Sequence, residues 1–390
     1  MRIILIILII TVSSSCTYVR IIHRNFPNIT DYKLFPQKVI HRAEKEFVFH
    51  TRAESMALPN QNEWGFYRGG KRITNSKVSL DKYLERSNTT ALIIIRNDSI
   101  LYEQYFNGYK RDRKSLNFSI TKAILSTLTA IAVKEDAFES FDQEIGDFIP
   151  MYAGDKRGKV TIGNLVDMNT GFDCNDYGQQ MRFIRLYYSK HPQKFMKRRK
   201  LKHDPGSHHA YSSFTSMLLG ICLEKATGKA LSQYMEEKLW KKLGTSFDAS
   251  ISTFQDGTPM AWGGLTSYPI DLVKFARLVL NRGRWGKEEI IPEQYIDACK
   301  DRSEGEGKVW RYSKGFWLDT YNCLKEEEIA KLNFKEQKRY CEDEEQVYAG
   351  GYRGQILFID FEKQLIILRL GTGNGNRNWS RSISKLATLL

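Results

Sequence analysis

The chain has 390 residues, 42% of them hydrophobic, and a formal net charge of +14 at neutral pH. This length and composition allow a sizeable core, in one large domain or in one domain with an inserted lobe. Internal repeats and low-complexity tracts are not apparent, which excludes a repeat architecture. The densest positive charge lies in residues 194–202. We interpret this run as a solvated surface segment rather than a nucleic-acid site.

The N-terminus has the pattern of an export signal. Arg2 precedes an apolar run from Ile3 to Val12, and three serines precede Cys16. The run is shorter than the roughly 17 residues that a transmembrane helix needs. We expect residues 1–15 to be a signal peptide, Cys16 to be lipidated, and the protein to lie in the periplasm or cell envelope, held at the membrane. An uncleaved anchor and plain cleavage are alternatives, because Ser13 stands where a lipidation signal usually has Leu.

The remaining cysteines and the histidines give no metal-ligand pattern. No pair has the Cys-x-x-Cys spacing of zinc sites, and His208 and His209 would face opposite ways on a strand. The sequence therefore predicts no metal, and it implies no organic cofactor. Cys323 and Cys341 bracket a charged segment, and both a disulfide and free thiols fit the sequence there.

The first part of the chain after the signal predicts no domain of its own. Residues 16–75 are polar and carry Pro27, Pro36 and Pro59, which favours a tether or a segment wrapped on the domain. A short amphipathic helix follows over residues 78–86. Residues 89–95 and 100–106 then predict a β-hairpin that turns at Asn97 and Asp98.

Residues 76–390 predict one domain of mixed elements. Helices are expected over residues 123–133, 214–227, 231–243 and 269–281, and a closing helix over 378–389. Strands are expected within residues 308–322, around 315–318, and over 356–360 and 365–370. Strands at both ends with helices between them indicate an α+β fold. We expect an antiparallel sheet built from the N- and C-terminal segments, flanked by helices, with a mostly helical lobe inserted at about residues 140–265.

Ser119 and Lys122 are the first candidates for catalysis. They are three residues apart at the start of the apolar helix, so they share one face, one turn apart. A serine hydroxyl needs a base to become a nucleophile, and a lysine whose pKa is lowered by burial supplies one. Ser-x-x-Lys is a motif of penicillin-recognising enzymes, but alone it also fits a capping serine followed by a surface lysine.

Further motifs in the right order make the chain resemble the serine β-lactamase and penicillin-binding-protein superfamily. The resemblance covers roughly residues 76–390 and is nearest the branch of class C β-lactamases, D-Ala-D-Ala carboxypeptidases, esterases and 6-aminohexanoate-dimer hydrolases. After Ser119-Ile120-Thr121-Lys122, it rests on Pro205-Gly206 with Tyr211-Ser212-Ser213, on the helix from Leu218 to Gly228, and on Gly351-Tyr352-Arg353-Gly354-Gln355. Singly, each of these motifs also fits a turn, a bend or a buried tyrosine.

The resemblance implies a β-lactamase-like fold and a role for each of these residues. Ser119 would be the nucleophile, Lys122 its proton acceptor, and Tyr211, as a phenolate, the second acid/base. The backbone N–H groups of Ser119 and Tyr352 would form the oxyanion hole. Ser213, Gly350, Gly351 and Arg353 would contact the substrate.

Two positions depart from the family pattern. Ser213 stands where the tyrosine motif usually has Asn, and Ala349 stands where β-lactamases and peptidases have Lys or His. The second departure argues against true penicillinase or carboxypeptidase activity and favours the esterase and amide-oligomer hydrolase branch. Arg353 lies close by, and we expect it to supply a positive charge instead.

The sequence thus predicts an envelope-associated serine hydrolase that cleaves an ester or amide bond through an acyl-enzyme on Ser119. The alternatives are a D-Ala-D-Ala peptidase or β-lactamase and, from another class, an inactive relative that binds cell-envelope peptide or glycan. The expected partners are a small ester, amide or peptide-like substrate and the membrane. We expect a monomer that binds no nucleic acid.

Overall fold

The computed structural model describes residues 27–51, 56, 58, 66–68, 71–73, 80–301, 303–305, 308–310, 312–318, 345–375 and 378–390. The expected signal peptide, Cys16, both cysteines of the candidate disulfide and most of the charged segment before Glu345 lie outside these residues. Within them, no helix is long and apolar enough to cross a membrane.

An eight-stranded sheet forms the centre of the fold. Its strand order is β14 (Tyr312–Ser313), β15 (Phe316–Leu318), β16 (Gln346–Gly351), β17 (Gln355–Asp360), β18 (Leu365–Gly371), β5 (Thr89–Arg96), β6 (Ser99–Tyr105) and β2 (His50–Thr51). Only the β2–β6 pair is parallel. N- and C-terminal strands therefore meet at β5 and β18, which confirms the expected α+β fold with a shared antiparallel sheet.

Both faces of this sheet are covered, because its central strands are apolar on both sides. On β5, Ile93 and Ile95 belong to the larger core, whereas Leu92 and Ile94 face the smaller one. The helix α11 (Pro269–Leu280) packs on β17 and β18 from the large-core side. The smaller core contains residues of α14 (Trp379–Leu389) and α4 (Leu80–Arg86). Continuous apolar strands are typical of a sheet buried on both faces.

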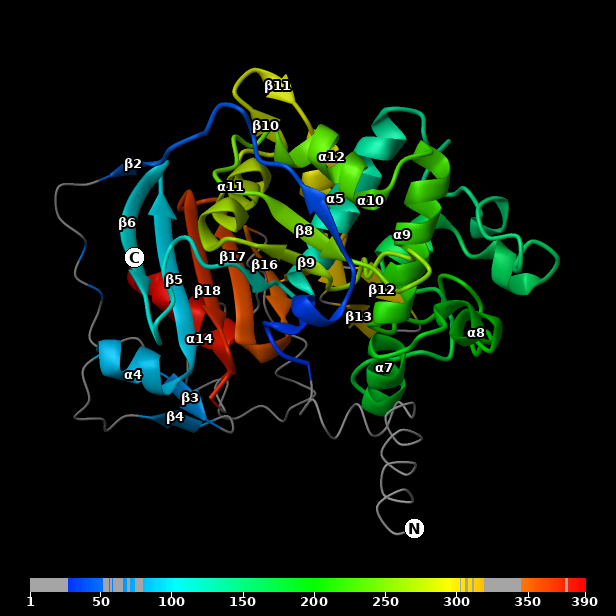
Figure 1. Cartoon of the computed structure of the whole chain (residues 1–390), viewed down its shortest axis with the longest axis horizontal. Helices are drawn as coiled ribbons and strands as arrows, with labels where there is room; N and C mark the ends of the chain where they lie inside the picture. The colour runs from blue at the N-terminus through cyan, green and yellow to red at the C-terminus, as the bar shows by residue number, and fades with distance from the viewer. Residues whose placement is uncertain are drawn as a thin grey trace, which may run out of the picture.

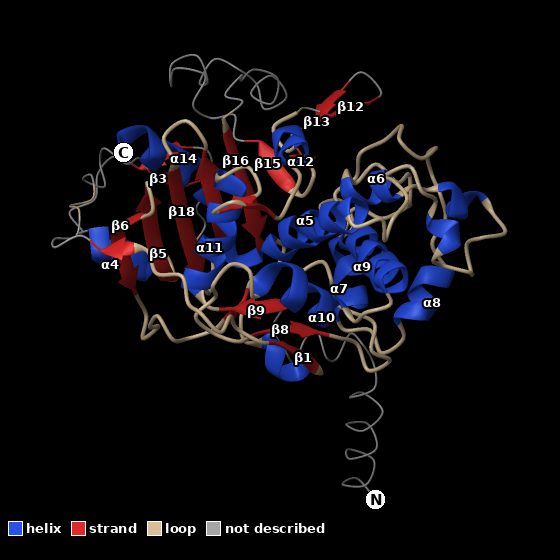
Figure 2. Ribbon diagram, turned by 90° about the horizontal axis from the view of Figure 1, so that it is seen from above, coloured by secondary structure: helices blue, strands red, loops and turns tan. Residues whose placement is uncertain are grey.

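A second sheet and a group of helices lie beside the first sheet (Figures 1 and 2). The second sheet has the order β1 (Gln37–Ile40), β8 (Ala249–Ser252), β9 (Leu265–Ser267) and β7 (Ser115–Leu116). Residues 37–40 thus run along the domain as an edge strand. The helical part contains α5 (Ile120–Lys134), α6 (Ile162–Val166), α7 (Gln180–Tyr187), α8 (Pro192–Lys197), α9 (Ser213–Thr227) and α10 (Leu231–Met235).

The remaining short elements connect these layers. They are η1 (Asp31–Leu34), β3 (Phe66–Arg68), β4 (Lys71–Ile73), η2 (Ile145–Asp147), η3 (Lys156–Lys159), β10 (Arg284–Trp285), β11 (Glu288–Glu289), α12 (Glu293–Ala298), β12 (Ser303–Gly305), β13 (Lys308–Trp310) and η5 (Tyr352–Gly354). The structure differs from the prediction of one continuous helix over residues 231–243. It has α10 followed by a π-helical turn, η4 (Glu236–Trp240). The bond from Lys241 N–H to Glu236 O spans five residues, which widens the turn.

Three elements converge on the start of α5. The helix α9 packs against α5, and β16 also contacts it. The turn between β14 and β15 approaches so closely that a Cβ on Gly315 would lie 2.9 Å from Ala123 Cα. Gly315 has φ +91°, which glycine adopts without strain. The N-terminal end of α5 is therefore enclosed by the helical part, the main sheet and this turn.

Candidate active site

The nucleophile candidate lies at the N-terminal end of α5. Ser119 is the residue that precedes the helix, and Lys122 lies one turn further on, with Nζ 2.9 Å from Ser119 Oγ. Phe118, before the serine, has φ +49°. A non-glycine residue in this left-handed region is uncommon and costs energy. The strained turn sets Ser119 at the helix end with its side chain at the cleft described below.

Lys122 is buried, with 3% of its surface exposed. Its Nζ also lies 3.2 Å from Ser213 Oγ and 3.0 Å from the carbonyl oxygen of Trp262. Burial lowers the pKa of Lys122 to about 8, while the negative charge of Asp176 opposes this fall. A fraction of Lys122 is therefore neutral at neutral pH, and a neutral amine at this distance can accept the Ser119 proton.

A close approach between α9 and the segment before β9 brings the Trp262 carbonyl to Lys122. A Cβ on Gly220 of α9 would lie 2.5 Å from the Ala261 side chain, so only glycine fits there. Trp262 itself is buried with 2% exposure. The carbonyl is consequently held by packing rather than by a flexible loop, which fixes one of the three contacts of Lys122.

Tyr211 lies against the same lysine. Lys122 Nζ is 4.9 Å from the centre of the Tyr211 ring, and the phenol hydrogen-bonds with the Ser119 side chain. Burial raises the pKa of Tyr211 well above its usual value, and the bond with Ser119 only partly offsets this rise. This direction favours a neutral phenol in the resting side chain, because neighbouring tyrosines and a tryptophan exclude water from the ring. The phenolate form of Tyr211 stays a prediction.

Ser213 connects Lys122 to a carboxylate that the sequence did not single out. Its hydroxyl donates to Asp176 Oδ2 at 2.6 Å, and its backbone N–H donates to the same oxygen at 2.9 Å. A serine hydroxyl has one proton. Because that proton is directed to Asp176, Ser213 in this structure links Lys122 to Asp176, and its expected contact with substrate stays a prediction. Burial raises the pKa of Asp176, and the Lys122 charge opposes that rise.

The segment from Gly350 to Tyr352 lies directly on the serine turn. A Cβ on Gly351 would lie 2.7 Å from Asn117 O, and the rings of Phe118 and Tyr352 meet edge to face at 5.6 Å. These contacts bring the segment of Gly351 and Tyr352 against Asn117 and Phe118, the two residues before Ser119. Gly350 and Gly351 both line the cleft. The pairing of the Ser119 and Tyr352 N–H groups on one oxyanion stays a prediction.

Arg353 borders the same cleft from the short helix η5. It has φ +69°, and its Nε donates to the carbonyl oxygen of Pro27 at 3.1 Å. Ala349, by contrast, is buried in β16 opposite Leu357 and offers no charge. Arg353 therefore places a cation at the cleft that Ser119 also lines, and its expected contact with substrate stays a prediction.

The cleft has a volume of about 670 Å³, within the usual range for small-molecule sites. Ser119, Asp176, Tyr211, Ser213 and Arg353 all line it. One wall is aromatic: Tyr211 lies 5.4 Å from Tyr177 and 5.1 Å from Trp317, measured between ring centres. Two apolar residues of α7, Phe183 and Ile184, also line the cleft. The arrangement suits an apolar chain whose carbonyl group reaches Ser119.

The structure brings together every predicted site residue except Cys16, which lies outside the described residues. Sequence reasoning missed two neighbours of Lys122, the Trp262 carbonyl and Asp176. A backbone carbonyl leaves no signal in a sequence. Asp176 is 37 residues from Ser213 in the chain and belongs to no motif, so its role becomes visible only in the fold.

Comparison with known proteins gives the family of the chain. The Beta-lactamase family model matches residues 80–383, so the chain belongs to that family and is a serine hydrolase. A 6-aminohexanoate-dimer hydrolase from Paenarthrobacter ureafaciens is 21% identical, with 80% of this chain and 85% of the relative covered.

Two solved structures show the same fold. One, from Bacillus anthracis, is described as a 6-aminohexanoate-dimer hydrolase; it has a TM-score of 0.72 at 19% identity and covers 93% of this chain and 90% of its own. The other, a D-alanine carboxypeptidase from Burkholderia cenocepacia, has a TM-score of 0.59 at 15% identity and covers 80% of this chain and 96% of its own. At these identities the likeness concerns the fold alone.

Proposed function

We propose that this serine hydrolase cleaves an ester or amide bond through an acyl-enzyme on Ser119. The observation that carries the proposal is the distance of 2.9 Å between Ser119 Oγ and a buried lysine amine whose pKa is lowered to about 8. An inactive binding relative needs no such lysine, because burying an amine without a carboxylate at ion-pair distance costs free energy.

Acylation begins when neutral Lys122 accepts the Ser119 proton and Oγ attacks the substrate carbonyl carbon. The N–H groups of Ser119 and Tyr352 stabilise the oxyanion that forms. Tyr211, a neutral phenol, donates its proton to the leaving oxygen or nitrogen as the bond to the carbonyl carbon breaks. The Tyr211 phenolate that remains then takes the proton from Lys122, whose amine lies 4.9 Å from the centre of the Tyr211 ring, and both groups are neutral again. In deacylation, water attacks the ester carbonyl carbon while Lys122 accepts a proton from it. The bond from the carbonyl carbon to Ser119 Oγ then breaks, Lys122 returns the proton to Oγ, and the acid leaves.

We propose that the acyl or leaving group is a short apolar chain. The aromatic wall of Tyr177, Tyr211 and Trp317 and the apolar side chains of α7 favour such a chain. The relative from Paenarthrobacter ureafaciens is named for an amide with this character, the 6-aminohexanoate dimer. A test panel therefore contains p-nitrophenyl acetate, p-nitrophenyl butyrate and that dimer.

A D-Ala-D-Ala peptidase or β-lactamase is the second candidate. The carboxypeptidase-like structure supports it, and buried Ala349 weakens it, because β-lactamases and peptidases have Lys or His there. Covalent labelling by a fluorescent penicillin separates the two candidates. A labelled wild-type protein with an unlabelled Ser119→Ala variant would favour the peptidase or β-lactamase reading.

The first experiment is intact-mass spectrometry of the protein and of Ser119→Ala after treatment with a phosphonate probe. We expect one adduct on the wild-type protein, together with turnover of a p-nitrophenyl ester, and neither with the variant. If both folded proteins lacked adduct and turnover, the acyl-enzyme proposal would be wrong and the binding-only relative would replace it.

Arg353→Ala tests whether the guanidinium orients carboxylate substrates. One charge-assisted hydrogen bond contributes about 1.5–3 kcal/mol, so we expect KM to rise roughly tenfold or more for an amide with a terminal carboxylate. The uncharged p-nitrophenyl butyrate serves as the matched control, and its KM should change little. Equal effects on both substrates would contradict the role given to Arg353.

We also propose that the protein is exported and held at the cell envelope through its N-terminal segment. Arg2, the apolar run from Ile3 to Val12 and Cys16 support this proposal. Metabolic labelling with a palmitate analogue tests it: incorporation that is lost in Cys16→Ser indicates lipidation, and protein found in the cytoplasmic fraction would overturn it.

A further inference from the structure

The surface around α7 and α8 has an unusual charge composition. Residues 177–203 contain nine Lys and Arg residues and no Asp or Glu. Two of the nine, Arg182 and Arg199, pair with Asp173. Six others are exposed, and within the described residues none of these six has an ion-pair partner. We call these six the basic face: Lys190, Lys194, Lys197, Arg198, Lys200 and Lys202.

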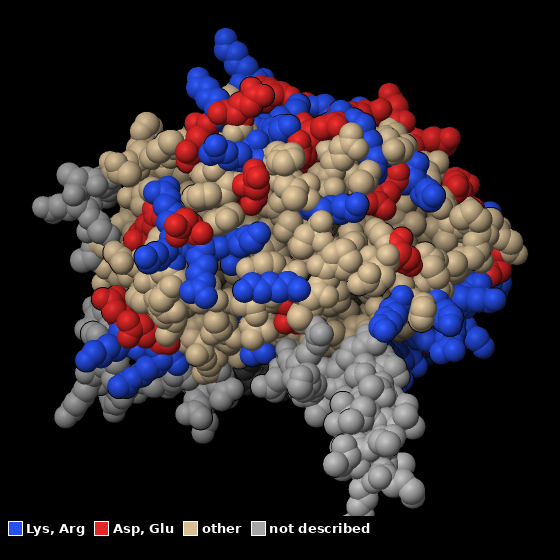
Figure 3. Space-filling model, viewed as in Figure 1, with Lys and Arg blue, Asp and Glu red and all other residues tan. Residues whose placement is uncertain are grey.

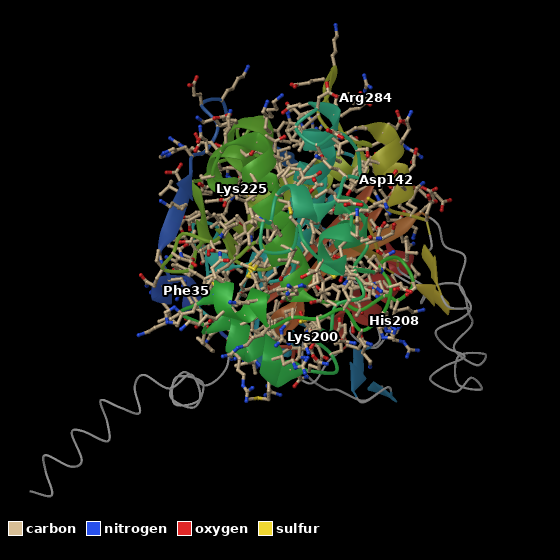
Figure 4. All side chains as sticks on the ribbon, turned by 90° about the vertical axis from the view of Figure 1, so that its right-hand side faces the viewer. Phe35, Asp142, Lys200, His208, Lys225 and Arg284 are labelled. Atoms are coloured by element: carbon tan, nitrogen blue, oxygen red, sulfur yellow. The ribbon has the colours of Figure 1, made fainter. Side chains whose placement is uncertain are left out.

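The basic face lies on one side of the molecule. Figure 3 shows Lys and Arg side chains gathered where Figure 1 labels α7 and α8. In Figure 4, Lys200 lies in the lower part of the domain, whereas Lys225 and Arg284 lie in the upper part. Cations elsewhere on the surface are interspersed with acidic residues, as in the pairs Lys159–Glu144 and Lys241–Glu236.

Exposed apolar side chains accompany these charges. Tyr177 and Met181, just before and within α7, are 68% and 45% exposed. Soluble polyanions give such side chains no partner, whereas a bilayer surface accepts apolar side chains between its headgroups and attracts cations through anionic lipids. Tyr177 and Met181 thus belong to the same stretch of chain as the six cations, and exposed apolar residues together with basic ones are the combination that an interfacial membrane surface requires.

The described chain begins beside this same face. Pro27 lines the cleft together with α7, and Asp31 accepts hydrogen bonds from Tyr187 and Tyr188 at the end of α7. Cys16, the expected lipidation site, is eleven residues before Pro27. Eleven residues span at most roughly 40 Å, so a lipid on Cys16 would hold the α7 side of the domain near the bilayer.

We propose that the basic face, with Tyr177 and Met181, binds the surface of an anionic lipid bilayer and orients the active-site cleft towards it. Because Tyr177, Phe183 and Ile184 also line the cleft, docking would leave the cleft opening at the headgroup level. The enzyme would then receive amphiphilic substrates from the membrane. This inference is independent of the bond that Ser119 cleaves.

The test uses the full chain on vesicles, with a local readout, because the apolar N-terminal run can hold the protein on any vesicle. Lysines are labelled by brief reductive methylation on phosphatidylcholine vesicles with or without about 30% phosphatidylglycerol. Lys225 and Lys287, exposed on other parts of the domain, serve as internal controls.

We expect labelling of Lys190, Lys194, Lys197 and Lys200 to slow at least about fivefold on the anionic vesicles and to recover at about 0.5 M NaCl, where charge is screened. Labelling of the two control lysines should not change. Equal labelling on both kinds of vesicle would overturn the proposal.

A charge variant tests the same surface with a second readout. In K194Q/K197Q/R198Q/K200Q, each lost charge lowers binding to anionic lipid about fivefold, or several hundredfold together. The vesicle-induced protection of backbone amides in residues 180–202 from hydrogen exchange should therefore disappear. The matched control K45Q/K225Q/R284Q/K287Q removes four exposed cations elsewhere and should keep it. If the control lost protection equally, or if soluble polyphosphate protected the parent as strongly as the vesicles, an anionic bilayer would not be the partner.

Discussion

Lys122 on α5 and Lys274 on α11 are both buried and have closely similar neighbours. Each amine contacts a serine hydroxyl and a backbone carbonyl: Ser213 and Trp262 for Lys122, and Ser246 and Gly244 for Lys274. In each case an aspartate accepts the backbone N–H of that serine. Burial is the main cause that lowers the pKa of either lysine.

The two aspartates, Asp271 and Asp176, differ in their distance from the lysine amine. Asp271 Oδ1 is 3.3 Å from Lys274 Nζ, and Glu46 adds a second carboxylate at 3.7 Å. Among the described residues, no carboxylate lies within 4 Å of Lys122 Nζ, and Asp176 reaches it only through Ser213. In place of a carboxylate, Lys122 contacts Ser119 Oγ.

The comparison shows how similar surroundings give two functions. Lys274 forms a direct ion pair with Asp271 of the same helix and also contacts Glu46, so its charged form has two carboxylate partners. Lys122 lacks the direct pair, so its charged form is less stabilised and a neutral amine becomes accessible near pH 8. If this is correct, equal substitutions at the two sites should affect different properties.

The largest difference is expected for the lysines themselves. In Lys122→Met, loss of the general base should lower kcat about 10²- to 10⁴-fold, while the free energy of unfolding stays equal or rises, because a costly buried amine is gone. In Lys274→Met, Asp271 loses its partner and the free energy of unfolding should fall by about 3–5 kcal/mol, with kcat of the folded fraction nearly unchanged. Ester turnover and urea unfolding measure the two effects. Loss of stability without loss of kcat at Lys122 would contradict its catalytic role.

The pH dependence of activity follows from the Lys122 pKa. Only the deprotonated amine can accept a proton, so kcat/KM should rise with pH and level off above about 8. Asp176 stabilises the charged amine; in Asp176→Asn the Lys122 pKa should fall further, and the inflection of the pH–rate profile should move to lower pH.

Asp271→Asn is the matched control for Asp176→Asn. It removes the direct partner of Lys274, so the free energy of unfolding should fall by about 3 kcal/mol, while the pH–rate profile keeps its inflection. A shift of the inflection in the Asp271 variant, or a shift to higher pH in the Asp176 variant, would show that the electrostatic assignment is wrong.

The sequence predicts the fold well because apolar patterning is local. The strands β5 and β18 are nearly continuous apolar runs, and the left-handed Gly228 ends α9 where its helical pattern stops. The Ser119–Lys122 pair is equally local, since helix geometry alone sets two residues three apart on one face.

The surroundings of the site are not local, which is why they could not be predicted. The link from Ser213 to Asp176 depends on how the segment before α7 folds back onto α9. The neutral state of Tyr211 depends on Tyr177, Tyr312 and Trp317, which come from two distant segments. Burial and pairing, rather than residue type, decide the protonation of these groups.

The smallest difference is expected for the serines. In Ser213→Ala, Lys122 loses one hydrogen-bond partner of its charged form and its link to Asp176, so the pH–rate inflection should move to lower pH and kcat should change by less than about tenfold. In Ser246→Ala, Lys274 keeps Asp271 and the Gly244 carbonyl, so the free energy of unfolding should fall by only about 1–2 kcal/mol, with an unchanged pH–rate profile.

Ser213→Asn, which introduces the usual family residue, sharpens this test: if Asn donates to Asp176 while accepting from Lys122, the inflection returns towards that of the parent. An inflection identical in all three Ser213 proteins would mean that position 213 does not act on Lys122.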